Sequence, residues 1–132
     1  GEKIGAIGYC FGGSVVLSMV NTGYLLDAAA VFHSGVELPV MPGDKDIDTK
    51  VLVCNGAEDP FVKEEQVEKY KNAMKEAGVD LEYISYEGAK HSFTNKDADE
   101  IGKKFDLPLA YDAEADRKSW EEMKDLFAST FE

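Results

Sequence analysis

Apolar residues along the chain fall into short continuous runs separated by longer segments with helical spacing. The runs predict four strands, over residues 3–8, 28–33, 50–55 and 80–86. The run Lys50-Val51-Leu52-Val53-Cys54-Asn55 is the clearest, because it is continuous and β-branched. Runs such as 28–33, which lack polar alternation, are typical of parallel strands buried on both faces.

The segments with helical spacing predict helices over residues 11–21, 63–77 and 113–131. Each has an apolar stripe that should form its buried face. In chain order these stripes are Val15, Val16, Met19 and Val20; Val67, Tyr70, Ala73, Met74 and Ala77; and Trp120, Met123, Leu126, Phe127 and Phe131.

The connections complete the prediction of an α/β fold. Residues 37–49 form a loop broken by Pro39, Pro42 and Gly43, and residues 95–104 form a charged stretch. Strands separated by helices or long crossovers pair in parallel with right-handed connections. We therefore predict one three-layer domain over residues 1–132, a parallel sheet with helices on both faces.

Composition limits the possible partners. The 132 residues are 44% hydrophobic and 30% charged, as in a soluble globular domain, and carry a formal net charge of −12. Nucleic acids and anionic membrane surfaces would repel such a chain, so we expect neither as a partner. No apolar run is long enough to span a bilayer, and no signal peptide is visible. Cys10 and Cys54 form no disulfide framework, which favours a reducing, cytoplasmic location.

The turn after the first strand carries the first chemical signal. Gly8-Tyr9-Cys10-Phe11-Gly12-Gly13 matches Gly-x-Cys-x-Gly, a nucleophile elbow with Cys in place of Ser. The apex residue, Cys10, is expected to be strained and to project above the carboxyl end of the sheet, with Gly8 and Gly12 as the small flanks that let the corner close. The N-terminus of the following helix favours the reactive thiolate. The alternative is a buried structural cysteine.

Two further residues complete a candidate triad. Asp59 follows the third strand and His91 the fourth, and side chains after parallel strands gather at one edge of the sheet. The order nucleophile, acid, histidine is that of α/β-hydrolases. Glu58 is an alternative acid, and Asp59 before Pro60 is also a common turn signal. His33 ends an apolar strand and is interpreted as a satisfied core histidine.

Three motifs together carry a family resemblance: Gly-Tyr-Cys-Phe-Gly-Gly at 8–13, Asn-Gly-Ala-Glu-Asp-Pro-Phe-Val at 55–62 and Gly-Ala-Lys-His-Ser-Phe at 88–93. With them, nearly the whole chain resembles the dienelactone hydrolase family, α/β-hydrolases with a Cys nucleophile that act on lactones and esters. The resemblance implies Cys10 as nucleophile, Asp59 as acid, His91 as base and the Phe11 backbone N–H as an oxyanion donor. It implies a small ester or lactone substrate, and we expect no cofactor and no metal.

Two departures from the family pattern accompany the resemblance. The chain begins almost at the elbow strand, so it resembles the C-terminal half of the family's domain, without the half that supplies the second oxyanion donor. The arginine expected shortly after the catalytic histidine is absent, and Lys96 replaces it only as a point charge.

Alternative functions follow from these departures. One is a non-catalytic binding module that keeps the hydrolase scaffold, and another is a thiol redox protein, although no Cys-x-x-Cys pair is present. We also expect an apolar sheet edge that permits self-association.

Overall fold

The computed structural model describes residues 2–43 and 46–132. Its strands form one parallel sheet in the order β1-β2-β3-β4. The elements in chain order are β1 (Gly5–Tyr9), α1 (Phe11–Asn21), β2 (Ala28–Phe32), β3 (Lys50–Gly56), α2 (Glu64–Glu76), β4 (Leu81–Tyr86), α3 (Ala98–Phe105) and α4 (Ala113–Phe131). The predicted α/β class is confirmed.

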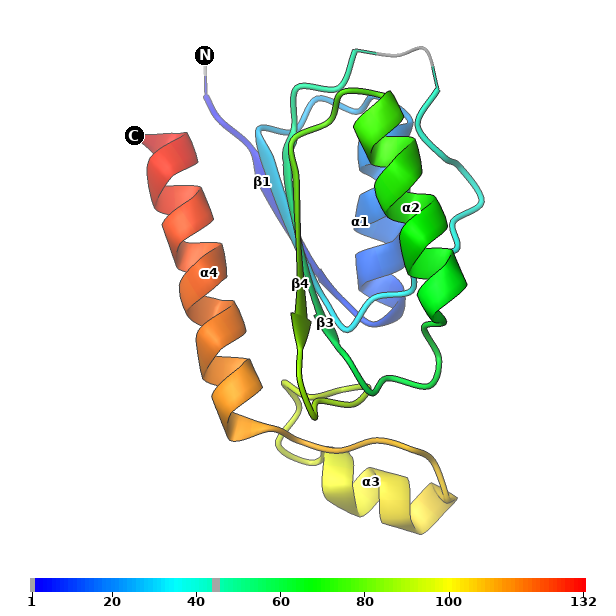
Figure 1. The fold of residues 1–132 in the computed structure, drawn as a ribbon. Helices are drawn as coiled ribbons and strands as arrows, with labels where there is room; N and C mark the ends of the chain where they lie inside the picture. The colour runs from blue at the N-terminus through cyan, green and yellow to red at the C-terminus, as the bar shows by residue number, and fades with distance from the viewer. Residues whose placement is uncertain (1, 44–45) are drawn as a thin grey trace.

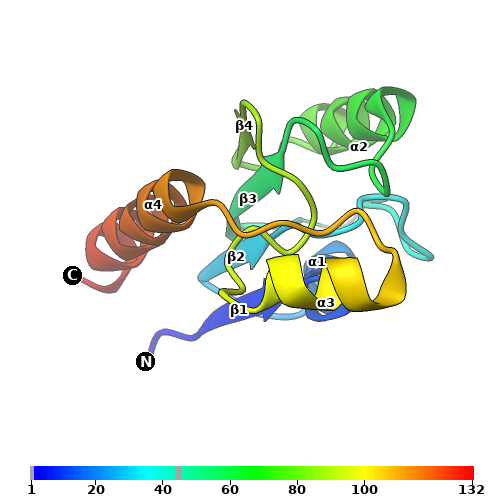
Figure 2. The same ribbon diagram turned by 90° about the horizontal axis from the view of Figure 1, so that it is seen from below.

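The sheet is covered on both faces. Helices α1 and α2 lie on one face and α4 lies on the other, while α3 lies beyond the carboxyl ends of the strands (Figures 1 and 2). One apolar cluster joins α1 and α2 to the sheet, and a second joins α4 to it. The central strands β2 and β3 contribute to both clusters, which explains their continuous apolar sequences.

The helix faces differ in part from the expected stripes. In α1, Val16 and Val20 are buried as expected, but Leu17 is fully buried as well and Val15 is exposed. In α4, Met123 is buried as expected, but Trp120 and Phe131 are exposed. Helix α4 packs mainly on β2 and β3. Its last turns also reach β1, because a Cβ on Gly5 would lie 2.7 Å from the Phe131 ring.

Helix α3 was not predicted, because residues 95–104 were interpreted as a charged stretch. Ala98 and Gly102 are its buried residues, and a Cβ at Gly102 would lie 2.8 Å from the carbonyl oxygen of Leu107. Acidic residues occupy its first turn and lysines its last, which complements the helix dipole. This ordering of charges, with small residues four apart, is the sequence signal for the helix.

Strand β1 is an edge of the described sheet. Its side chains Ile7 and Tyr9 are exposed. The expected loop at 37–49 is irregular over its described residues, while residues 1, 44 and 45 lie outside the description. Among the described residues, no helix has both the length and the apolar character needed to cross a membrane.

Candidate active site

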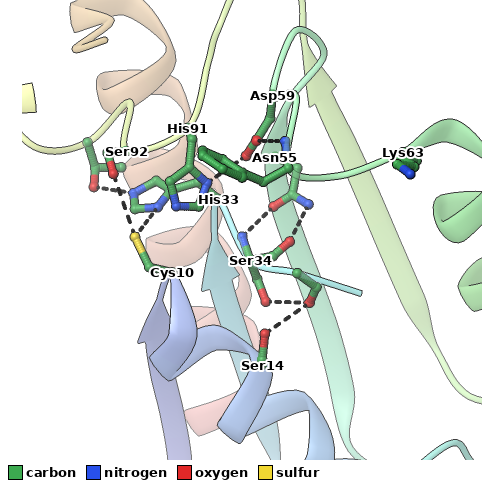
Figure 3. A network of polar contacts seen from close by, with 12 residues as sticks. Cys10, Ser14, His33, Ser34, Asn55, Asp59, Lys63, His91 and Ser92 are labelled. Carbon is green, nitrogen blue, oxygen red and sulfur yellow. Dashed lines mark hydrogen bonds and ion pairs between the residues drawn. The ribbon is translucent and has the colours of Figure 1, made fainter. Parts of the chain in front are cut away.

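Cys10 occupies a sharp corner between β1 and α1. Its backbone has φ 53° and ψ −123°, outside the conformations that non-glycine residues normally adopt. The Cys10 N–H donates to the Phe32 carbonyl oxygen at 3.1 Å, and its own carbonyl accepts from Gly13 N–H at 3.0 Å. The corner is therefore fixed on both sides, and the Cys10 side chain lies at the carboxyl ends of the strands (Figure 3).

The steric need for glycine in this corner falls on Gly8 and Gly13. A Cβ on Gly8 would lie 2.4 Å from the Gly12 carbonyl oxygen, and one on Gly13 would lie 2.6 Å from the Cβ of Ser34. A Cβ on Gly12 would meet nothing within 4 Å. The expected requirement for a small residue at Gly12 is thus wrong for the described residues. It is the Gly12 backbone, rather than its missing side chain, that excludes a larger residue at Gly8.

Asp59 and His91 contact each other directly. Asp59 Oδ2 lies 2.8 Å from Nδ1 of His91, while Asp59 Oδ1 accepts from the Phe61 N–H at 2.9 Å. The carboxylate is completely buried, and the imidazole is largely buried. Glu58, the alternative acid, is exposed. The Asp59 contact fixes the tautomer of His91 so that Nδ1 carries a proton and Nε2 is left for another partner.

A close approach of two loops makes this contact possible. A Cβ on Gly56, at the end of β3, would fall 2.2 Å from the Ala89 carbonyl oxygen. That same oxygen accepts from the Glu58 N–H at 3.0 Å. The loop that carries His91 therefore packs directly on the turn that carries Asp59.

Two histidines surround the Cys10 thiol. Its Sγ lies 3.1 Å from Nδ1 of His33 and 3.7 Å from Oγ of Ser92. The Cys10 sulfur, one ring nitrogen of His33 and one ring nitrogen of His91 all lie within 4.8 Å of one another. The structure therefore brings together Cys10, Asp59 and His91, as expected from their positions after three strands.

His33 is the site residue that sequence reasoning missed. It is buried and hydrogen-bonded, as expected of a core histidine, but its partners are Cys10 and, at 2.8 Å through Nε2, Thr94 Oγ1. Its φ of 40° turns the chain sharply at the end of β2. His33 also follows the carboxyl end of a strand, the rule that located the other three residues, and that signal was available.

Asn55 holds the segment that carries His33. Its side-chain oxygen accepts from the Ser34 N–H at 2.9 Å, and its amide nitrogen donates to the Ser34 carbonyl at 2.8 Å. These paired bonds attach the end of β2 to β3 (Figure 3). Both residues are buried, so the bonds are shielded from water and define the position of His33.

The environment favours a charged pair between Cys10 and His91. Partial burial alone would raise the pKa of Cys10, but hydrogen bonds to His33 and His91 outweigh it and lower the pKa to about 5. Burial would lower the pKa of His91, yet its hydrogen bonds to Asp59 and Cys10 raise that pKa to about 9. At neutral pH the site therefore holds a thiolate beside an imidazolium. By contrast, burial raises the pKa of Cys54 to about 12.

Two exposed aromatic side chains belong to the neighbourhood of the site, one directly after Cys10 in the chain and one against His91. Phe11 is 81% exposed and Phe61 is 54% exposed, and the Phe61 ring stands edge-on to His91 with centroids 5.1 Å apart. A hollow of about 420 Å³ lies elsewhere, between residues 36–41 and α2. Cys10 does not line this hollow, and the described residues leave the thiol partly exposed with apolar side chains nearby.

The sequence and the fold match known proteins. The family model described as the dienelactone hydrolase family matches residues 1–131. The chain belongs to the dienelactone hydrolase family. A solved dienelactone hydrolase-like promiscuous phosphotriesterase from metagenomic libraries is 40% identical with a TM-score of 0.89.

This chain matches different shares of two curated relatives. An uncharacterized Caenorhabditis elegans protein is 29% identical over 96% of this chain and 82% of its own length. A Synechocystis protein with the provisional name carboxymethylenebutenolidase is 27% identical over 96% of this chain and 50% of its own. The match to the phosphotriesterase covers 100% of this chain and 54% of the phosphotriesterase chain.

Proposed function

We propose that this chain carries the nucleophilic centre of a hydrolase that cleaves a small carboxylic ester or lactone. The observation that carries the proposal is the arrangement of Cys10, His91 and Asp59, in which a thiol and a buried carboxylate lie on either side of one imidazole. A nucleophile, a base and a group that orients the base are the parts required for acyl transfer.

The proposed reaction has two halves. The Cys10 thiolate attacks the ester carbonyl carbon, and collapse of the tetrahedral intermediate breaks the bond to the leaving oxygen, which takes a proton from His91. The acyl group is then a thioester on Cys10. Neutral His91 next removes a proton from water as the water oxygen attacks the thioester. Collapse releases the carboxylic acid and restores the thiolate and the imidazolium.

The Phe11 backbone N–H is the proposed donor to the oxyanion. Phe11 is the first residue of α1, and the N–H groups of a first helical turn have no partner within their own helix. A complete oxyanion hole needs a second donor, and losing one donor costs about 10²–10³ in turnover. We therefore expect this polypeptide alone to be acylated readily at Cys10 but to turn over slowly.

Acylation of the purified chain by p-nitrophenyl acetate tests the proposal. Mass spectrometry should find one acetyl group per chain, located on Cys10, with release of one equivalent of nitrophenolate. Cys10→Ala should abolish the adduct, whereas Cys54→Ala, which removes the other thiol, should leave it intact. Asp59→Asn should slow acylation, because His91 loses the carboxylate that orients it.

The competing function is a binding module that keeps only the scaffold. In that case acetyl groups would appear slowly and on surface lysines, and the Cys10→Ala and wild-type chains would label equally. Such a result would overturn the proposal. Rapid steady-state turnover by the chain alone would preserve the nucleophile but contradict the expected lack of a second oxyanion donor.

Phosphotriesters are a second proposed substrate class. The supporting observation is the 40% identity to a protein described as a promiscuous phosphotriesterase. A thiolate beside an imidazolium can attack a phosphoryl centre in the same way as a carbonyl carbon. Incubation with paraoxon should then add one diethylphosphoryl group to Cys10, and its absence would restrict the proposal to carboxylic esters.

A further inference from the structure

Three side chains at the site have the composition of a metal-binding set. Cys10, His33 and His91 offer one thiol sulfur and two imidazole nitrogens, all within 4.8 Å of one another. A tetrahedral Zn²⁺ with Zn–S near 2.3 Å and Zn–N near 2.0–2.1 Å places its ligand atoms about 3.3–3.6 Å apart. The Cys10 sulfur and the His33 Nδ1 are 3.1 Å apart, so a small separation of the two admits an ion.

Each histidine already has the outer partner that a metal ligand needs. Nδ1 of His91 donates to Asp59 Oδ2 at 2.8 Å, which leaves Nε2 as the ligand atom. Nε2 of His33 lies 2.8 Å from Thr94 Oγ1. In the metal-free site Nδ1 of His33 donates to the Cys10 thiolate, whereas metal binding requires the other tautomer, in which Nε2 donates to Thr94 and the Nδ1 lone pair faces the ion. Hydrogen bonds of this kind orient ligating imidazoles and increase their basicity.

We propose that Cys10, His33 and His91 form a three-ligand site for Zn²⁺ that occupies the nucleophile. Binding displaces the proton on Nε2 of His91, and the thiolate lone pair that would attack the substrate goes to the metal. Nitrogen and sulfur ligands suit Zn²⁺, whereas Mg²⁺ and Ca²⁺ prefer oxygen. From the sequence we predict no metal. The three ligands, 23 and 58 residues apart in the chain, form no recognisable spacing motif.

The site is accessible to an ion from solvent. Cys10 and His91 are partly exposed, and the fourth tetrahedral position is left for water or a small ligand. Bound Zn²⁺ would prevent acylation and chelation would restore it. Inhibition by the metal rests on the proposed hydrolase function, but metal binding itself does not.

Metal titration of the complete chain tests the site without an activity measurement. Co²⁺ alone, added to the metal-free protein, should give tetrahedral d–d absorption and a thiolate charge-transfer band at one equivalent, and Zn²⁺ should displace it. Competition with a chromophoric chelator then gives the Zn²⁺ affinity. Loss of an outer partner weakens such sites by about 10- to 100-fold, so Asp59→Asn should show at least that loss.

Variants of the ligands separate this site from adventitious binding. Cys10→Ser should remove the charge-transfer band, and His33→Phe should lower Zn²⁺ affinity about tenfold or more. Cys54→Ala, the control for the second thiol, should change neither the stoichiometry nor the spectrum. Circular dichroism should confirm that each variant is folded.

Two results would overturn the metal site: no saturable binding by the wild-type chain, or equal affinity in the Cys10→Ser or His33→Phe variant. Full acylation of the Zn²⁺-loaded chain by p-nitrophenyl acetate would refute inhibition alone. Failure of the metal-free chain to be acylated at all would instead refute the proposed function, and the Co²⁺ spectrum would still decide the metal site.

Discussion

The two cysteines show how strongly local surroundings set the chemistry of one side chain. Cys10, beside two histidines, has a pKa of about 5, while Cys54, buried in the sheet beneath α4, has a pKa of about 12. An acid with a lowered pKa is ionised at every pH above that value. Cys10 is therefore a thiolate across the neutral range, and Cys54 is a thiol.

Alkylation with iodoacetamide should separate the two thiols. The Cys10 rate should rise with a midpoint near pH 5 and then stay level until about pH 9, where His91 loses its proton. Cys54 should be modified far more slowly at every pH in this range. Peptide mapping gives each rate, with Cys10→Ser as control, and equal rates at pH 7 would contradict the assignment.

His33 should influence the thiol without replacing His91 as the proposed base, because its outer nitrogen contacts a hydroxyl and not a carboxylate. A hydrogen bond to a charged group contributes about 1.5–3 kcal/mol, equivalent to about one or two pKa units. His33→Phe should thus raise the alkylation midpoint of Cys10 by about that amount. Thr94→Val should cause a smaller rise, and an unchanged midpoint in both variants would refute the role.

At the residue scale, the sequence predicts that three side chains gather at the ends of the strands, but it does not predict that His33 joins them. Cys10, Asp59 and His91 each follow a motif or a turn signal. His33 follows an apolar run of the kind found in any buried strand. Its contact with Cys10 depends on its φ of 40° and on the hydrogen bonds between Asn55 and the neighbouring Ser34. The position of His33 after a strand can be read from the sequence, but neither of these two features has a local sequence signature.

At the scale of elements, the β1–α1 corner has room for a Cβ at Gly12 but not at Gly8 or Gly13. Gly8→Ala and Gly13→Ala would force atoms to within 2.4 and 2.6 Å of the Gly12 carbonyl and the Ser34 side chain, respectively. Each should destabilise the fold by about 1–3 kcal/mol, the usual cost of overpacking. Gly12→Ala should be neutral or slightly stabilising, since alanine favours helices by about 1 kcal/mol over glycine.

Thermal unfolding followed by circular dichroism measures these differences. The Gly12→Ala variant is the matched control, because it makes the same chemical change one helix position away from Gly13. A loss of stability in Gly12→Ala equal to that in Gly8→Ala would show that the motif, and not the contact, sets the requirement.

Strands and long helices were predictable because burial imposes a period on their residues. Helix α4 was predicted over its observed span, and β2 and β3 within one residue at one end. Helix α3 escaped prediction because only Ala98 and Gly102 are buried, and neither is strongly apolar. The exposure of Trp120 also lay beyond sequence reasoning, because periodicity reports a helix face but not what covers it.

For the whole molecule, the exposed edge at β1 predicts self-association of this polypeptide. Apolar Ile7 and Tyr9 are exposed beside unpaired strand backbone, which is a template for pairing with another chain. The net charge of −12 opposes association at low salt. Sedimentation velocity should therefore detect larger species as salt increases. Ile7→Glu should keep the chain monomeric, and association unaffected by this substitution would place the interface elsewhere.

The described chain has four non-glycine residues with positive φ. Three of them meet at one sulfur atom: Cys10, which carries it, and His33 and Ser92, which contact it. Such conformations cost about 1–3 kcal/mol each, a large share of the 5–15 kcal/mol that holds a typical domain folded. Glycine would relieve that cost at each position. A descendant lineage that abandons the chemistry is thus under pressure to acquire glycine at these positions. Glycine at positions 10, 33 or 92 of a related sequence would therefore indicate that selection no longer maintains the reaction there.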